Sequence, residues 1–171
     1  MPLSLADGRT KFTILTTEPD DPESPTITEL NNGLQADPYI LKSDFTWGAT
    51  DSDKVAEPPL SAENNQNALA ASNFAAGVTA FRYHDAAGVS EADFDDVFQA
   101  LKAKGTNLWC YARRTSKKAS AAWAAGDEIF LGGHVITDEP QPPSQQGGYV
   151  KYRIPLEMQE AYPWTAAAAA A

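Results

Sequence analysis

The alternation of apolar and polar positions predicts a chain built mostly of strands. Residues 11–17, KFTILTT, are rich in β-forming side chains, and residues 148–159, GYVKYRIPLEMQ, alternate cleanly between apolar and polar positions. Such alternation is the pattern of a strand with one buried face. Further stretches with strand character are residues 39–53, 74–85, 106–114 and 128–140.

One stretch has the helical period instead. Within residues 90–105, SEADFDDVFQALKAKG, the apolar side chains recur at the spacing of one helix face. The residues that we expect to form this buried face are Phe94, Val97, Phe98 and Leu101. Ser90 is the predicted N-cap and Gly105 the predicted end. A shorter helix is predicted between Ser24, as its cap, and Gly33.

The order of strands, one amphipathic helix and more strands predicts a β-dominated α+β fold. We expect two packed antiparallel sheets, as a sandwich or open barrel, with one flanking α-helix. Residues 1–160 are predicted to form a single domain, and residues 161–171, AYPWTAAAAAA, a C-terminal tail. Residues 51–73 form a long excursion with adjacent prolines and little periodicity, which is typical of a functional or disordered loop.

Composition narrows the possible partners. The 171 residues carry a formal net charge of −10, which argues against general nucleic-acid binding and against anionic membranes. No apolar run is long enough to span a bilayer, and the first residues lack the pattern of a signal peptide, so we expect synthesis in a cytoplasm. The single cysteine, Cys110, lies in the apolar stretch LWCY and is expected to be a buried thiol.

Positive charge is concentrated in one segment. Residues 102–118 contain six bases and no acid. Four of these bases fall within six positions, and we call them the basic cluster: Arg113, Arg114, Lys117 and Lys118. A solvated loop, a protein–protein contact and a phosphate site could each explain such a cluster. No aromatic side chains interleave with it, as they do in single-stranded nucleic-acid sites, and we favour a contact with the protein's own acidic surface.

Candidate chemistry is sparse. The two histidines, His84 and His134, have no nucleophile motif beside them, and no Gly-rich phosphate loop or zinc-ligand spacing occurs. We therefore expect no enzymatic activity, no cofactor and no metal. Trp47, Trp109 and Trp123 could form a sugar-binding platform, although packing in a core or an interface is the usual role of such side chains.

The order and spacing of several segments resemble a known family. They are similar to the major tail protein, or tail tube protein, of long-tailed phages that infect actinobacteria. The segments that carry the resemblance are SLADGRTKFTILTTEP, PTITELNNG, ILKSDF, ASNF, FRYHDAAG, DDVFQALKAKGTNLW, AAWAAGDEI and VITDEPQPPSQQGGYVKYRIPL. Each is weakly specific alone, but together they span nearly the whole chain.

The resemblance implies a structural virion protein of the phage tail. It implies hexameric rings stacked into a tube, in which one sheet per subunit joins its neighbours around a lumen. The implied partners are further copies of the chain, the tape measure protein, the tail terminator, distal tail proteins and phage DNA passing through without specific binding. Residues 51–73 match the family's long loop, which contacts the adjacent ring. A tail terminator, a secretion-tube ring protein and a soluble binding module remain alternatives.

Two sets of residues are expected to serve this assembly. The expected inter-subunit contacts are Glu57, Pro58, Pro59, Leu60 and Glu63 of the long loop, with Arg113, Arg114, Lys117 and Lys118. A negative inner wall discourages adhesion of DNA. The acidic residues expected to face the lumen are Asp44, Asp51 and Asp53.

Overall fold

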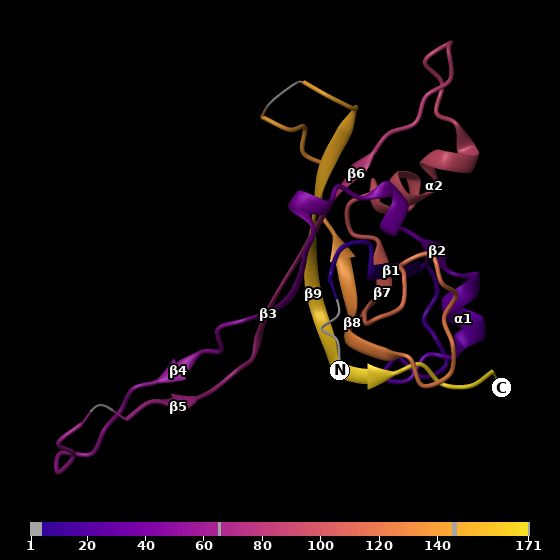
Figure 1. The fold of residues 1–171 in the computed structure, drawn as a ribbon. Helices are drawn as coiled ribbons and strands as arrows, with labels where there is room; N and C mark the ends of the chain where they lie inside the picture. The colour runs from indigo at the N-terminus through magenta and orange to yellow at the C-terminus, as the bar shows by residue number, and fades with distance from the viewer. Residues whose placement is uncertain (1–4, 65, 145–146, 171) are drawn as a thin grey trace.

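One antiparallel sheet of seven strands forms the body of the protein in a computed structural model, which describes residues 5–64, 66–144 and 147–170 (Figure 1). Its strands are β1 (Thr10–Leu15), β2 (Leu34–Gln35), β3 (Thr46–Thr50), β6 (Asn73–Phe81), β7 (Asn107–Arg114), β8 (Glu128–Thr137) and β9 (Lys151–Ala166). They follow one another in the order β2-β1-β7-β8-β9-β6-β3. Only β2 and β3 therefore lie at the edges.

The remaining elements are small. The strands β4 (Lys54–Val55) and β5 (Ala68–Leu69) form a separate ribbon that extends away from the body (Figure 1). Two α-helices, α1 (Ile27–Asn32) and α2 (Ala92–Leu101), and two 3-10 turns, η1 (Asp37–Tyr39) and η2 (Lys42–Asp44), complete the part of the chain that the structure describes. The prediction of a β-dominated α+β fold is confirmed.

The large sheet folds over on itself and so supplies both layers of the predicted sandwich. Four strands separate β1 from β3 in the sheet order, yet the rings of Phe12 and Trp47 lie 5.1 Å apart. The indole Nε1 of Trp47 also donates a hydrogen bond, at 2.9 Å, to the carbonyl oxygen of Leu131 on β8. Apolar side chains between the layers, such as Ile154, are fully buried.

β9 is the strand that belongs to both layers. Its first residues pair with β6, and the rest of the strand pairs with β8. Leu156 stands at the change of partner, because it lies opposite Ala76 on β6 and opposite Thr137 on β8. A strand that passes from one layer to the other is a common way to form the corner of a β-sandwich.

A bulge and two glycines allow β8 to follow this curvature. The pairing of β8 with β9 shifts between His134 and Val135, and such a bulge bends and twists a strand. A side chain at Gly132 would begin 2.7 Å from the ring of Tyr111, so only glycine leaves room for that ring. The adjacent glycines of this strand therefore mark a site of close packing.

The C-terminal boundary differs from the prediction. Residues 161–166 continue β9 and pair with β8, and Ala167 is buried. Its amide donates a hydrogen bond to the carbonyl oxygen of Asp127 at 3.0 Å. The alanine-rich sequence carries no alternation of polarity, so its pairing could not be read from the pattern. These residues are part of the domain and not of a tail.

The helix predicted between Ser24 and Gly33 is present, but the prediction that Ser24 is its N-cap is wrong. α1 begins after Thr26, whose hydroxyl accepts the amide of Glu29 while the Glu29 carboxylate accepts the amide of Thr26 at 2.8 Å. This reciprocal pair is a capping box. Ser24 instead donates its hydroxyl to the carbonyl oxygen of Ala166, at 3.2 Å. The helix ends at Gly33, as predicted.

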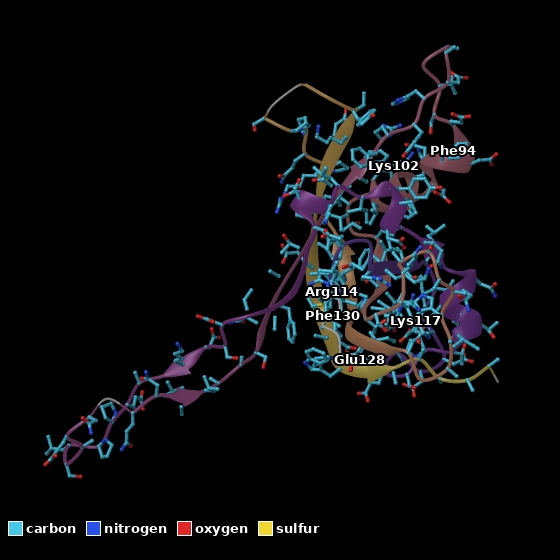
Figure 2. The ribbon with its side chains drawn as sticks, viewed as in Figure 1. Phe94, Lys102, Arg114, Lys117, Glu128 and Phe130 are labelled. Carbon is cyan, nitrogen blue, oxygen red and sulfur yellow. The ribbon has the colours of Figure 1, made fainter. Side chains whose placement is uncertain are left out.

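The helix α2 packs on the sheet through most of its predicted face. Val97, Phe98 and Leu101 are buried, and the guanidinium of Arg82 lies 4.1 Å from the ring centre of Phe98. Phe94 does not join them, because it is 46% exposed and lies on the outer part of the helix (Figure 2). Its ring lies 6.0 Å from that of Tyr83, outside the main core.

A buried carboxylate fixes the start of α2. Asp95 accepts a bifurcated hydrogen bond from the single Nε–H of Arg82, at 3.0 and 3.1 Å, and a hydrogen bond from the amide of Tyr83 at 3.0 Å. Ser90 and Gln99 also donate to it, at 2.6 and 2.8 Å, so Ser90 does not serve as the predicted N-cap. Burial alone would raise the pKa of Asp95, but these donors hold the pKa well below its usual range.

The packing of α2 predicts unequal effects at its two phenylalanines. Phe98→Ala should lower the free energy of unfolding by about 3–5 kcal/mol, because it leaves a cavity beneath the helix. Phe94→Ala should cost less than about 1 kcal/mol, because that side chain is half exposed. Chemical denaturation of the unassembled subunits measures both changes. Equal losses would show that the buried face is wrongly assigned.

The buried carboxylate predicts a specific acid sensitivity. Because the folded pKa of Asp95 lies below that of the unfolded chain, near 3.9, its contribution to stability is complete above about pH 4 and declines as the pH falls further. Asp95→Asn should therefore be less stable than the wild type at pH 7 and should lose less stability between pH 7 and pH 3. Asp93→Asn, at an exposed position, is the control and should follow the wild-type curve.

Candidate functional site

The long excursion forms a projecting hairpin, which we call the arm (residues 51–72). At its base, the amide of Ala70 donates a hydrogen bond to the carbonyl oxygen of Asp53 at 2.8 Å. The amide of Asp53 donates to the carbonyl oxygen of Ala71 at 2.9 Å. The side-chain amide of Asn73 adds hydrogen bonds to the carbonyl oxygen of Asp51, at 3.1 Å, and to the carboxylate of Asp53, at 2.9 Å. The base of the arm is thus fixed to Asn73, the first residue of β6, while the rest of the arm extends into solvent (Figure 1).

The tip of the arm presents an apolar side chain to solvent. A turn closes on the hydrogen bond from the amide of Ala62 to the carbonyl oxygen of Pro59, at 2.9 Å, and Leu60 within it is fully exposed. Among the described residues from 53 to 72, only Ala62 is half-buried. The predicted contact residues Glu57, Pro58, Pro59, Leu60 and Glu63 are all exposed. The arm contributes nothing to the core of its own body.

The basic cluster is divided between the interior and the surface, and the expectation for Arg113 is wrong. Arg113 is fully buried, and its guanidinium pairs with the carboxylate of Asp127 at 2.5 Å. The same guanidinium donates to the carbonyl oxygens of Lys118 and Ala121, each at 3.0 Å. A side chain held in this way cannot contact a second subunit. Its role is to hold residues 115–127 against the sheet.

Asp127 is the centre of this buried network. Besides Arg113, its carboxylate accepts the Nζ of Lys117 and the amide of Ala124. Burial would raise the pKa of Asp127, but Lys117, Ala124 and Arg113 together lower it. The Lys117 side chain remains 44% exposed, so half of this cation faces solvent while its charge is already paired within the subunit.

The loop that this network fixes covers a second, smaller core. The indole of Trp123 is buried, donates to the hydroxyl of Thr13 at 2.8 Å, and lies beside the Arg113 guanidinium. Leu30 of α1 packs in the same cluster. The strand period of residues 107–114 places Arg113 on the same face as Tyr111, and a cation on that buried face requires a partner. That signal could have revealed Arg113, but not the identity of Asp127.

Arg114 and Lys118 are the exposed members of the basic cluster that form no ion pair among the described residues. The Nε of Arg114 donates to the hydroxyl of Thr10 at 2.9 Å, and its guanidinium lies 5.4 Å from the ring centre of Phe130 (Figure 2). These neutral contacts orient the Arg114 side chain, and its charge has no counter-ion within the described part of the subunit. Arg114 is therefore suited to bind an external carboxylate.

A pocket of about 360 Å³ opens beside Arg114. Its walls are Ala6, Asp7, Gly8, Thr10, Phe12, Asp37, Ile40, Lys42, Phe45, Arg114 and Ala119. The exposed pair Lys42–Asp7 lies at the rim. Burial raises the pKa of Asp37, and the lowering effect of Lys11 does not offset it. The pocket thus combines apolar walls with two cations, Lys42 and Arg114, and two carboxylates, Asp7 and Asp37.

The predicted lumen residues occupy different environments. Asp44 lies in η2, is half-buried and accepts the hydroxyl of the buried Thr79, so it stabilises the turn before β3. Asp51 and Asp53 are exposed at the base of the arm. The two exposed carboxylates lie where the arm leaves the sheet.

The residues considered for chemistry do not form a common site. Cys110 is fully buried, and burial raises the pKa of its thiol. His134 stacks on Trp109 at 4.8 Å, while Trp47 and Trp123 are each buried in a different core, so the three tryptophans do not form a platform. Within the described ranges, no group of His, Cys, Asp or Glu side chains could hold a metal ion. None of the helices there is long and apolar enough to cross a membrane.

One exposed aromatic residue was missed by the sequence analysis. Trp164, near the end of β9, is 73% exposed and has a backbone φ of 55°. Positive φ is uncommon for a bulky residue. The alanines that follow it gave no reason to expect a strand at this position.

Taken together, these features define a β-rich protein with a projecting, solvent-exposed arm. A comparison with protein families identifies the phage tail tube proteins, whose family model matches residues 1–171. The chain belongs to this family and is a structural component of a bacteriophage tail. Comparisons with curated proteins and with solved structures found no match.

The buried network predicts a large loss of stability when its carboxylate is removed. Asp127→Ala should lower the free energy of unfolding by about 3–5 kcal/mol, because it leaves the Arg113 charge buried and unpaired. Adding Arg113→Met should recover part of that loss. Asp138→Ala is the control, since its pair with Lys104 is exposed and should contribute little to stability. If Asp127→Ala is as mild as Asp138→Ala in chemical denaturation, the network does not stabilise the fold.

Proposed function

We propose that the chain assembles into hexameric rings that stack into the phage tail tube, through which the genome is delivered. The observation that carries this proposal is the arm, a hairpin whose described residues from 53 to 72 are almost all exposed and whose tip is apolar. Exposed apolar side chains on a projecting element are typical of contact with another molecule. We propose that this molecule is a subunit of the adjacent ring.

The sheet edges supply a second route to assembly. An edge strand has unpaired backbone groups that can bind a strand of another chain. The edge strand β3 pairs on one side only, with β6. At the other edge, the short strand β2 pairs with only part of β1. We propose that pairing between such edges joins subunits within a ring, which would remove the free edges of each monomer.

The lumen and the basic cluster are proposed to act through charge. We propose that Asp51 and Asp53 contribute to a negative inner wall that disfavours adhesion of DNA. Asp44 would contribute less, since its carboxylate is held by Thr79. In the basic cluster, Arg114 and Lys118 are the residues proposed to meet acidic surfaces of neighbouring copies, since each is exposed.

The further partners follow from the family resemblance. We propose that the tube is built around a tape measure protein and is joined to a tail terminator and to distal tail proteins. The chain would act as a structural subunit and not as an enzyme, and it would be assembled in the host cytoplasm. An actinobacterial host is part of the same proposal.

Electron microscopy of the purified chain tests this function. At increasing concentration we expect stacked rings, and persistent monomers would contradict the proposal. Single rings that do not stack would favour a tail terminator. As a matched variant, residues 54–69 can be replaced by an Asn-Gly turn, which suits a two-residue hairpin. This variant should fold, because the described residues among 54–69 belong to neither core cluster, and should form no stack.

A further inference from the structure

We propose that the pocket beside Arg114 receives the arm tip of a second copy of the chain. In this contact Leu60 enters the pocket, and Glu57 or Glu63 binds the guanidinium of Arg114. The inference rests on the proposed stacking, and it adds which surface of the next subunit accepts the arm. It follows from three features: the shape of the pocket, the form of the arm tip and the charges on both.

The pocket has the character of a site for an apolar side chain. Phe12, Ile40 and Phe45 belong to its walls and also to the main core, so the pocket leads from the surface toward that core. Its volume, about 360 Å³, leaves room for a leucine together with a neighbouring proline. Apolar walls of this kind are stabilised when a side chain displaces water from them.

The arm tip has the complementary form. Leu60 lies in the turn closed by Pro59 and Ala62, so its side chain projects from a fixed point at the end of the hairpin. Pro58 and Pro59 have restricted backbone angles, which reduces the conformational freedom lost on docking. The tip is therefore already shaped for insertion before it meets a partner.

The arm tip cannot reach the pocket of its own subunit. Figure 1 shows the arm extending away from the sheet, with its tip far from the body that contains β1, η1 and η2. The pocket is lined by residues of that body. A contact between tip and pocket is thus intermolecular, and because the two surfaces differ, it joins copies head to tail.

The charges support this pairing of surfaces. Between residues 55 and 72 the arm has two acids, Glu57 and Glu63, and no base. Four charged side chains line the pocket: Asp7, Asp37, Lys42 and Arg114. Asp7 pairs with Lys42, and Asp37 feels the charge of the neighbouring Lys11. Arg114 forms no ion pair among the described residues of its own subunit. Because the two glutamates lie on either side of Leu60 in the sequence, a docked Leu60 would bring a carboxylate near the pocket edge.

Disulfide trapping in the full-length chain tests the contact. In Ser61→Cys with Lys42→Cys, one thiol lies at the arm tip beside Leu60 and the other at the pocket rim, and the native Cys110 is buried and does not compete. Leu60 itself is retained, so the proposed contact can still form. Mild oxidation of assembled particles should give a ladder of linked subunits on a non-reducing gel, because every copy has both an arm and a pocket. Ser61→Cys with Lys102→Cys is the control, since Lys102 is exposed on the C-cap of α2, away from the pocket.

Each outcome decides between the two proposals. Stacked rings with a ladder for the Lys42 pair alone support the inference. Stacked rings with no such ladder, or with equal ladders for both pairs, overturn the inference and leave the proposed function intact. A wild-type chain that never forms stacks overturns both.

Charge reversal provides an independent test. Arg114→Glu should raise the concentration needed for stacking at least tenfold, and so should Glu57→Lys combined with Glu63→Lys. The chain that carries all three changes should stack at nearly the wild-type concentration, since the attraction is restored with its sign reversed. Lys102→Glu is the matched control and should have little effect. If the triple variant is as defective as its parents while its thermal unfolding is unchanged, the proposed pairing is wrong.

Discussion

The fold depends on the constraint that β9 pairs with a different neighbour in each of its two parts. Leu156 faces both Ala76 and Thr137, so the two layers are joined covalently at this point. The core can then close only if the sheet curves, and the bulge in β8 and the close packing at Gly132 allow that curvature. The hydrogen bond from the indole Nε1 of Trp47 to the carbonyl oxygen of Leu131 crosses this interior and gives the buried indole N–H its partner.

Two buried carboxylates attach the connecting segments to this sheet. Asp95 fixes the start of α2, and Asp127 fixes the loop that covers Trp123. A buried charge is costly unless it is paired and hydrogen-bonded. Asp95 therefore retains Arg82, and Asp127 retains Arg113 and Lys117. The outward positive charge of the basic cluster is correspondingly smaller than its composition suggests.

Periodicity predicted those parts of the fold in which burial repeats along the chain. The helical period located the buried side chains Val97, Phe98 and Leu101 of α2, whereas β1 and β7 were located by their β-forming side chains, since residues on both faces of these strands are buried. Periodicity failed for Phe94 and for residues 161–166, whose environments are set by residues distant in the sequence or by alanines without a pattern. Arg113 was assigned to the surface from its charge, although the strand period places it on the buried face. The excursion of residues 51–73 was evident from its lack of periodicity. Its hairpin form and the pocket depend on tertiary structure and could not be predicted.

In the proposed assembly, the arm and the body have opposite mechanical requirements. The body would have to be rigid, so that its edges and its pocket keep the same geometry in every copy. The arm would have to reach beyond its own subunit. It lacks a core, is held by backbone hydrogen bonds at its base, around Asp53, and has a proline-restricted tip. A contact between unlike surfaces propagates unless rotation closes it into a ring. An arm that cannot fold back on its own body would thus favour growth of a stack over self-closure of the monomer.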